Sequence, residues 1–171
     1  MNRNVEIKAV ASDLRTQGER VRTMSHGAPE LLEQEDTFFR TRRGRLKLRR
    51  LSDKRGELIY YERPDDSGPA ESRYMLLPTT EPDALKRALG KALGVRGVVR
   101  KRREVLIVNR TRVHLDEVDG LGDYIELEAV LEAGETRERG ERRVGELMAE
   151  MGIVDGDLVD RAYIDLLLDE G

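Results

Sequence analysis

The sequence predicts an α+β protein in which about eight strands close into an antiparallel β-barrel with flanking helices. Several segments place ionisable residues two positions apart, mostly with apolar residues between them, as in Glu6-Ile7-Lys8 and Glu126-Leu127-Glu128. Because successive side chains of a strand point to opposite faces, such segments form a sheet with one charged and one apolar face. The helical segments suffice to cover one face only, and closure removes exposed sheet edges, so the charged face is expected to line a cavity.

The N-terminal half contains five of the expected strands. Alternation and turn residues predict them over residues 4–10, 31–40, 45–51, 57–63 and 72–77, the last ending before Pro78. Between the first two, Ser12 or Asp13 can cap a helix that runs to about residue 24, and Gly27 with Pro29 then breaks the chain. Turns are predicted at Gly44, at residues 53–56 and at the Pro-Asp-Asp-Ser-Gly-Pro segment 64–69.

The C-terminal half combines helices with the remaining strands. A helix over residues 80–93 has Thr80 as its N-cap and Gly94 as its C-cap. Its apolar stripe at helical spacing consists of Leu85, Ala88, Leu89, Ala92 and Leu93. Alternation predicts a hairpin over 98–108 and 111–118 and a strand over 124–131, followed by helices over 138–151 and 158–168. We expect a single domain over residues 1–171, with barrel strands at about 3–134 and C-terminal helices at about 138–169.

The composition excludes several classes of protein. Apolar and charged residues each make up 38% of the chain, which fits a small core around a polar interior, and the net charge is −3. The absence of cysteine excludes disulfides, thiolate chemistry and zinc sites built on cysteine. No apolar run approaches the ~20 residues needed to span a bilayer, and no apolar signal segment precedes the first strand. We therefore expect a cytoplasmic protein that does not interact with membranes.

Four carboxylates share the charged face of the predicted sheet. They are Glu6, Asp116, Glu126 and Glu128. Carboxylates gathered in one place repel one another unless a cation lies between them, and Mg²⁺ or Mn²⁺ is the natural occupant of such a site. The alternative is that these acids pair with neighbouring arginines, and spacing alone does not separate the two interpretations.

A larger set of cations lies on the same face. It comprises Lys8, Arg45, Lys47, Arg49, Arg63, Lys101, Arg103 and Arg112. So many positive charges in one enclosure require a polyanion or several carboxylates, and a triphosphate fits in charge and length. The alternatives are a solvated face with weak ion pairs, or nucleic-acid binding through the basic segment 40–50, which the few aromatic residues and the negative net charge disfavour. His114 could orient a phosphate or relay a proton, or it could be a hydrogen-bonded structural residue.

In order and spacing, a set of segments resembles the CYTH domain of the triphosphate tunnel metalloenzyme superfamily, and most closely its class IV adenylyl cyclase–like branch. The segments are Asn4-Val-Glu-Ile-Lys-Ala9, Glu35-Asp-Thr-Phe-Phe39, Gly44-Arg-Leu-Lys-Leu-Arg49, Tyr61-Glu-Arg-Pro-Asp65, Val99-Arg-Lys-Arg-Arg103 and Thr111 to Gly122 running into Tyr124-Ile-Glu-Leu-Glu128. The resemblance implies an eight-stranded tunnel that binds a triphosphate with a divalent cation. Members cyclise ATP, or hydrolyse inorganic triphosphate or thiamine triphosphate.

The resemblance also implies roles for individual residues. It assigns Glu6, Asp116, Glu126 and Glu128 to the metal, which would be Mg²⁺ or Mn²⁺. It assigns phosphate binding to Lys8, Lys47, Arg49, Arg63, Lys101, Arg103 and Arg112, with catalysis resting on Lys8, Lys47, Arg49, Lys101 and Arg103. Their position on the charged face adds Arg45 and His114 as phosphate-binding candidates. Asn4 departs from the family's Glu-x-Glu-x-Lys signature, so one metal site is expected to be weaker or absent. The expected activity is cyclisation of ATP, with triphosphate hydrolysis or non-catalytic triphosphate binding as alternatives and a homodimer as a possible assembly.

Overall fold

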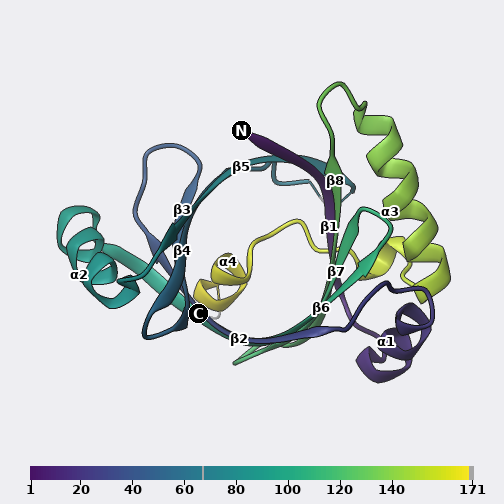
Figure 1. The fold of residues 1–171 in the computed structure, drawn as a ribbon, viewed down its shortest axis with the longest axis horizontal. Coiled ribbons are helices and arrows are strands. Elements are labelled where there is room, and N and C mark those ends of the chain that lie inside the picture. The colour runs from purple at the N-terminus through teal and green to yellow at the C-terminus, as the bar shows by residue number, and fades with distance from the viewer. Residues whose placement is uncertain (67, 170–171) are drawn as a thin grey trace.

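The computed structural model describes residues 1–66 and 68–169, and over these the chain forms a closed β-barrel with four α-helices packed on it (Figure 1). Around the barrel the strand order is β1-β5-β4-β3-β2-β6-β7-β8, and each pair of neighbours is antiparallel. The predicted eight-stranded antiparallel barrel is therefore confirmed. Ser67, within the loop predicted over 64–69, lies outside the described residues.

The elements match the expected ones, with bounds shifted by a few residues. The strands are β1 Asn2–Val10, β2 Glu30–Phe39, β3 Arg45–Ser52, β4 Arg55–Glu62, β5 Ala70–Thr79, β6 Val95–Val108, β7 Thr111–Val118 and β8 Gly122–Leu131. The helices are α1 Leu14–Arg22, α2 Pro82–Leu93, α3 Arg137–Met151 and α4 Tyr163–Leu168, with a short 3-10 turn at Asp155–Asp157. In the described part of the chain, none of the helices has the length and apolar character that crossing a bilayer requires.

The strand register sends charged and apolar side chains to opposite sides of the barrel wall. On β8, Leu127 is fully buried on the outer side, while Glu126 and Glu128 face the interior. The neighbouring strands place Lys8 of β1 and His114 of β7 on either side of Glu126. The alternation in the sequence therefore sets which residues meet inside the barrel.

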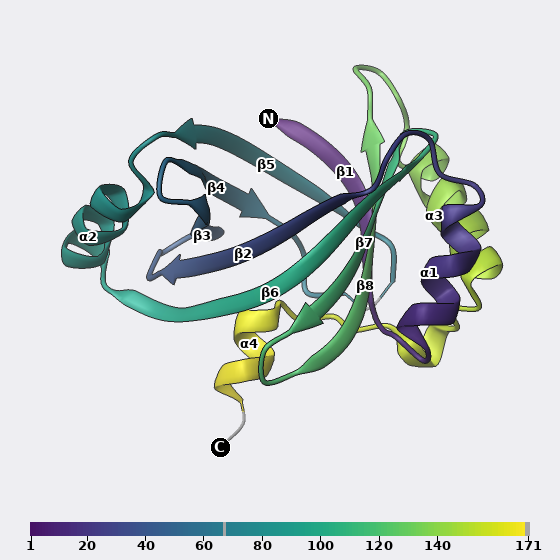
Figure 2. The ribbon, with the colours of Figure 1, turned by 60° about the horizontal axis from the view of Figure 1, so that its bottom comes forward.

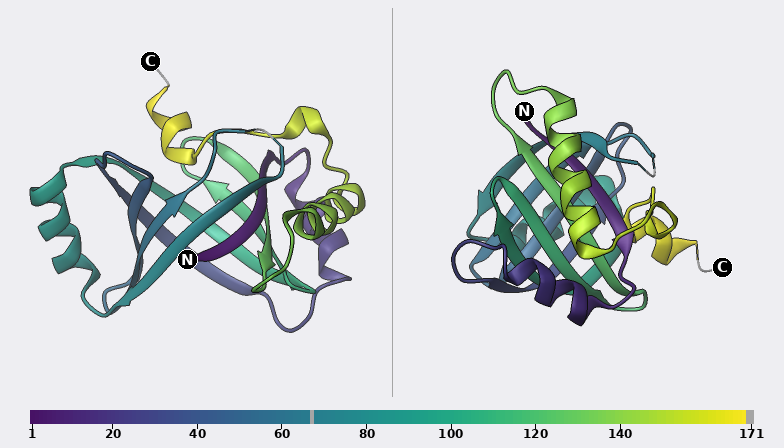
Figure 3. Two further views of the ribbon diagram at one scale, coloured as in Figure 1. Left: turned by 90° about the horizontal axis from the view of Figure 1, so that it is seen from above. Right: turned by 90° about the vertical axis from the view of Figure 1, so that its right-hand side faces the viewer.

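Two helices cover the part of the barrel formed by β1, β7 and β8, as the right-hand view of Figure 3 shows. Val144 and Met151 of α3 are fully buried against Val5 and Leu127 of the sheet. Helix α3 comes so close that a Cβ on Gly140 would lie 2.6 Å from a methyl group of Val5. This packing forms the main hydrophobic core, so the core lies outside the barrel and leaves its interior free for polar groups.

Helix α2 lies at the other side of the barrel, against β2, β3 and β4 (Figure 1). Its predicted apolar stripe is only partly covered, because Leu85 and Leu89 are half-buried while Leu93 is exposed. The expected N-cap is wrong by one residue: Glu81 is the N-cap and Pro82 is the first helical residue, a position that suits a group without an N–H. Strand β5 likewise continues past Pro78, close to its end, where the missing N–H removes little pairing.

The last predicted helix begins later than expected and lies at one end of the barrel (Figure 2). Residues 158–162 are extended instead of helical, because Leu158 pairs with Ala9 and the Val159 N–H donates to the Lys8 carbonyl at 2.9 Å. Helix α4 follows, and its Tyr163 packs inside this end of the barrel with Phe38 and inward-facing residues of β6, β7 and β8. The C-terminal segment therefore reaches the polar interior, which the prediction of a plain covering helix did not anticipate.

Candidate functional site

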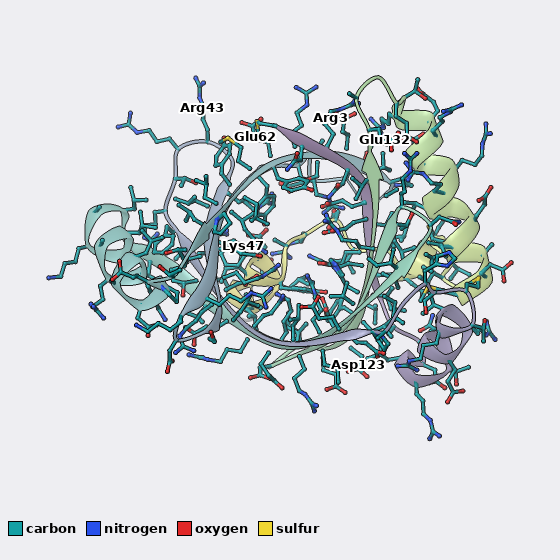
Figure 4. The ribbon with its side chains drawn as sticks, viewed as in Figure 1. Arg3, Arg43, Lys47, Glu62, Asp123 and Glu132 are labelled. Atoms are coloured by element: carbon teal, nitrogen blue, oxygen red, sulfur yellow. The ribbon has the colours of Figure 1, made fainter. Side chains whose placement is uncertain are left out.

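A cavity of about 560 Å³ lies inside the barrel, within the range of about 300–1,000 Å³ typical of small-molecule sites. Figure 4 shows Lys47 inside the ring of strands and Arg43 outside it. The predicted site residues that line the cavity are Glu6, Lys8, Arg45, Lys47, Arg49, Arg63, Arg103, Arg112, His114, Glu126 and Glu128. Lys101 and Asp116 instead lie buried in the wall beside it. The charged face is thus enclosed, which rules out a flat, solvated sheet face.

Asp36 is the centre of the cationic side of the cavity. Its carboxylate is buried and accepts hydrogen bonds from Lys47 at 2.9 Å, from Arg49 at 2.9 Å to each oxygen, and from Lys101 at 3.1 Å. Burial alone would raise the pKa of Asp36, but these three cations hold it well below the usual range. One carboxylate therefore fixes three of the predicted phosphate-binding side chains in a single cluster.

Lys101 is the most deeply buried member of this cluster, with 1% of its side chain exposed. Burial lowers its pKa to about 7, and the neighbouring charges of Arg103, Arg49 and Lys47 act in the same direction against the opposing effect of Asp36. In the free protein at pH 8, most Lys101 side chains are therefore neutral. A bound polyanion would favour the protonated form and raise this pKa.

We therefore expect inorganic triphosphate to bind with uptake of protons between pH 7 and pH 9, and to bind more weakly as pH rises through this range. Calorimetric titration without metal, in two buffers of different ionisation enthalpy, measures the uptake. The variant Lys101→Arg, whose guanidinium stays charged, serves as the reference and should take up fewer protons, by up to about one per site. Equal uptake by both proteins would show that Lys101 is already charged in the free state.

Arg103 joins the two sides of the cavity. Its guanidinium donates to Asp116 at 2.7 and 2.6 Å and to Glu126 at 2.7 Å. Asp116 is fully buried, and its second partner is the Tyr163 hydroxyl at 2.7 Å. Because both oxygens of Asp116 are bonded within the wall, the structure places this carboxylate behind Arg103 and away from the cavity surface.

Glu6 and Arg63 form a second pair that faces the cavity. The Arg63 Nε lies 3.2 Å from a Glu6 oxygen, yet its buried Nε and Nη2 groups make no hydrogen bond of good geometry among the described residues. Burial raises the pKa of Glu6 to about 7, and the Glu128 carboxylate adds to this rise. Buried donors without a well-formed hydrogen bond are rare in folded proteins, and Arg63 is one of the residues that line the polar cavity.

Lys8 connects the cavity to the C-terminal segment. Its ammonium donates to the Arg161 carbonyl at 2.9 Å, lies 3.6 Å from Glu126 and sits 4.0 Å from the centre of the Tyr163 ring. Burial lowers its pKa to about 8. The sequence singled out Lys8 but gave no sign that a residue of the last helix would contact it.

The carboxylates of β8 lie beside His114 and fit a divalent cation. One ligand atom from each of His114, Glu126 and Glu128 can be chosen so that all three lie within 4.8 Å of one another. Asn4 lies near by on β1, buried, and its amide oxygen accepts from Arg112 at 3.2 Å when the amide is oriented to satisfy its neighbours. Of the predicted metal ligands, Glu126 and Glu128 thus lie beside His114, and Glu6 lines a small pocket with both of them, whereas Asp116 does not join them.

A wider cleft of about 1390 Å³ adjoins the cavity where α4 crosses the barrel end, and Arg45 and Arg63 line both spaces. Arg45 is held there by Asp65 at 2.8 Å and by Asp165 of α4 at 3.2 Å. The basic segment 40–50 is divided between the two sides of the wall, since Lys47 and Arg49 face inward. Arg40 and Arg43 of the same segment line the wider cleft.

Sequence reasoning missed two residues that organise this site. Asp36 shares the inward side of β2 with Gln34 and Phe38, so the parity of the predicted strand 31–40 could have placed it in the cavity. Tyr163 lies within the helix predicted over 158–168, and no local signal marks its hydroxyl as a partner of Asp116. The first omission was avoidable, while the second depends on where the chain end returns.

Comparison with known proteins agrees with this geometry. The CYTH domain family model matches residues 2–163, which include all the barrel strands and the return to Tyr163. The chain belongs to the CYTH domain family. Its resemblance to that family is thereby confirmed, whereas none of the curated proteins compared with it matches.

Solved structures of similar fold include the PH1012 protein of Pyrococcus horikoshii OT3, with a TM-score of 0.82, 21% identity and coverage of 95% of this chain and 98% of that one. A candidate adenylate cyclase of Vibrio parahaemolyticus has a TM-score of 0.77 at 19% identity, covering 96% and 97%. The adenylyl cyclase candidate HpAC1 of Hippeastrum, for which a dominant triphosphatase activity is described, has a TM-score of 0.63 at 16% identity, covering 98% and 94%. At these identities the likeness shows the fold alone.

Proposed function

We propose that this CYTH domain is a divalent-metal-dependent enzyme that binds a triphosphate in its barrel and, as its most favoured activity, converts ATP to cyclic AMP and pyrophosphate. The observation that carries the proposal is Arg63, which lines a cavity together with further fixed cations and whose buried Nε and Nη2 form no well-aligned hydrogen bond among the described residues. Phosphate oxygens would satisfy these donors, since guanidinium groups match phosphate in charge and geometry.

The cations would act by position and charge. Lys47 and Arg49 are held by Asp36 on one side, and Arg103 and Arg112 are held by Glu126 and Glu128 on the other. A phosphate chain between the two groups would receive donors from both sides without rearrangement of the wall. Phosphoryl transfer depends mainly on such positioning and on stabilisation of the charge that develops on the leaving group.

His114, Glu126 and Glu128 would hold the metal, with Glu6 near by, because this set offers one nitrogen and several carboxylate oxygens in a small space. A divalent cation at this position would neutralise charge on the phosphates and polarise the phosphorus–oxygen bonds. Asp116 would instead keep Arg103 in place, since its oxygens already accept from Arg103 and Tyr163.

For cyclisation, the ribose 3′-hydroxyl oxygen bonds to the α-phosphorus, its proton passes to water, and the bond from that phosphorus to pyrophosphate breaks. Hydrolysis instead requires activation of water at the terminal phosphorus, which in many enzymes uses a second metal. Asn4 replaces a carboxylate of the family signature and contributes only a neutral oxygen, already in contact with Arg112. This replacement weakens a second metal site, so cyclisation is the favoured activity.

Hydrolysis of inorganic or organic triphosphates is the second candidate. It is supported by the similarity of fold to HpAC1, for which triphosphatase activity dominates. A barrel that binds triphosphate or polyphosphate without chemistry is the remaining alternative, and Asn4 is the feature that favours it.

We also propose that residues 1–171 act as one domain in the cytoplasm, without nucleic-acid partners. The exposed Met75 and Leu77 on the outer face of the barrel support a homodimer.

The proposal is tested by a product assay on the purified protein with Mg²⁺ or Mn²⁺, with ATP and inorganic triphosphate as parallel substrates. Cyclic AMP together with pyrophosphate is the expected result. Orthophosphate from triphosphate without cyclic AMP from ATP would show that the protein is a phosphohydrolase and not a cyclase. A melting temperature that triphosphate raises, without any product, would indicate a binding protein.

A further inference from the structure

We propose that His114 is a direct ligand of the metal in this barrel, so that the site prefers Mn²⁺ and other first-row transition-metal ions to Mg²⁺. The inference rests on the proposed metal-dependent function and specifies which cation that function uses. It starts from the geometry of three neighbouring inward positions. The register places His114 of β7 directly opposite Glu126 of β8, and Glu128 follows two residues later on the same side of the strand.

Among the described residues, the imidazole makes only long contacts to its polar neighbours. The residue is 5% exposed, and its Nδ1 lies 3.4 Å from Glu126 while its Nε2 lies 3.9 Å from Glu128. Hydrogen bonds of nitrogen donors are usually about 2.7–3.2 Å long, so neither contact is well formed. A structural histidine that is this buried would normally have a tighter partner. Each ring nitrogen instead lies nearest a carboxylate, and all three side chains line the cavity.

The two glutamates are held in place by cations that leave part of each carboxylate free. The Glu126 Oε2 accepts from Arg103 at 2.7 Å, and the Glu128 Oε2 accepts from Arg112 at 2.9 Å. Among the described residues, neither Oε1 atom accepts a hydrogen bond, and the Glu126 Oε1 has only Lys8 at 3.6 Å. In metal sites of proteins, the ligating carboxylates are typically held in orientation by hydrogen bonds from surrounding residues.

The chemistry of this ligand set decides which ion it favours. Mg²⁺ takes oxygen ligands and gives up water reluctantly, whereas imidazole nitrogen suits transition metals. A set of one imidazole and two carboxylates therefore binds Mn²⁺ more tightly than Mg²⁺, and Co²⁺ more tightly still, by the usual order of affinities. A site built only from Glu6, Glu126 and Glu128 would show a weaker preference of this kind.

The test is pulsed electron paramagnetic resonance of Mn²⁺ bound to the protein without a histidine tag and without substrate. Nitrogen coordinated to Mn²⁺ modulates the electron spin echo, and we expect this ¹⁴N modulation in the wild type. It should be lost in His114→Gln, with Mn²⁺ affinity falling about 10–100-fold and Mg²⁺ affinity changing less. The control is His26→Gln, because His26 is the second of the two histidines in the chain and is exposed in a loop.

Bound Mn²⁺ without ¹⁴N modulation in the wild type would overturn the inference, and this result does not depend on how the variant folds. So would modulation that persists in His114→Gln but disappears in His26→Gln. The rise in melting temperature with metal-free triphosphate is measured in parallel. If triphosphate binds but bound Mn²⁺ gives no ¹⁴N modulation from an imidazole, the metal assignment fails while triphosphate binding stands.

Discussion

Replacing Lys47 by alanine is expected to lower turnover of the triphosphate substrate by about 10²–10³-fold, the usual cost of removing one fixed donor from a charge-stabilising site. Lys47 lines the cavity, and 15% of its side chain is exposed. One N–H group of its ammonium donates a hydrogen bond to Asp36 at 2.9 Å, which leaves two N–H groups for a phosphate chain. The Phe38 and Tyr61 rings, with centres 5.6 and 5.7 Å away, limit where the ammonium can move.

The same substitution should leave the fold nearly unchanged. Asp36 keeps two hydrogen bonds from Arg49 and one from Lys101 when Lys47 is removed, so no buried carboxylate is left without a partner. The loss of one ion pair is offset by relief of the buried charge, because burial lowers the pKa of Lys47. A melting temperature within about 3 °C of the wild type is therefore expected.

Steady-state kinetics with ATP and with inorganic triphosphate, together with a thermal melt, measure both effects. The matched control is Lys54→Ala, which removes an exposed lysine from the turn that follows β3 and should leave turnover unaltered. Lys47→Arg keeps the charge and should recover part of the lost activity. Turnover of Lys47→Ala equal to that of Lys54→Ala would remove Lys47 from the site.

Arg103 cannot serve as an equivalent probe, although the family resemblance places it among the catalytic residues. Its guanidinium is the hydrogen-bond partner of Asp116 and Glu126 at the same time. Removing it would leave two buried carboxylates without their main counter-charge, at a cost of about 3–5 kcal/mol. A loss of activity in Arg103→Ala would therefore not distinguish unfolding of the protein from loss of a catalytic side chain.

The contrast between these two residues shows what the sequence could and could not predict. Period-two alternation is local, so it correctly placed Lys47, Arg103 and Glu126 on the inner side of their strands. Which cation meets which carboxylate depends on register between strands that are far apart in the chain. Asp36 of β2 meets Lys101 of β6 only because residues 36 and 101 are brought together by the β2–β6 pairing.

The C-terminal segment illustrates the same limit more strongly. Its helical pattern from residue 158 is overridden by pairing of Leu158 with Ala9, and helix α4 starts only at Tyr163. The contact of Tyr163 with Asp116 depends on the path of the chain over the barrel end. No pattern within the segment encodes that path, because it follows from packing against strands formed much earlier in the sequence.

Asp36→Asn is expected to destabilise the protein by about 3–5 kcal/mol, because it removes the buried carboxylate that Lys47, Arg49 and Lys101 share as a hydrogen-bond acceptor. This corresponds to a fall of roughly 10 °C in melting temperature for a chain of this length. The sign follows from the pKa shift: burial opposes ionisation, but the cations lower the pKa of Asp36 far enough to prevail. The carboxylate therefore stabilises the fold fully at pH values above its unfolded pKa of about 4, and loses this effect only in stronger acid.

Two comparisons separate charge from packing in the Asp36 variant. Asp83→Asn removes the partner of Arg50 in an exposed ion pair at 2.9 Å and should cost less than about 1 kcal/mol. The double variant Asp36→Asn with Lys101→Met should be more stable than Asp36→Asn alone, because it removes a buried cation together with the missing carboxylate.

Inorganic triphosphate should raise the melting temperature of Asp36→Asn by more than that of the wild type, since phosphate oxygens can take the place of the lost carboxylate beside Lys47 and Arg49. Thermal melts with and without triphosphate, in the absence of metal, provide the measurement. A variant as stable as the wild type would show that the three cations need no counter-ion. A destabilised variant that triphosphate does not rescue would show that the ligand binds away from this cluster, so the experiment locates the phosphate chain as well as the source of stability.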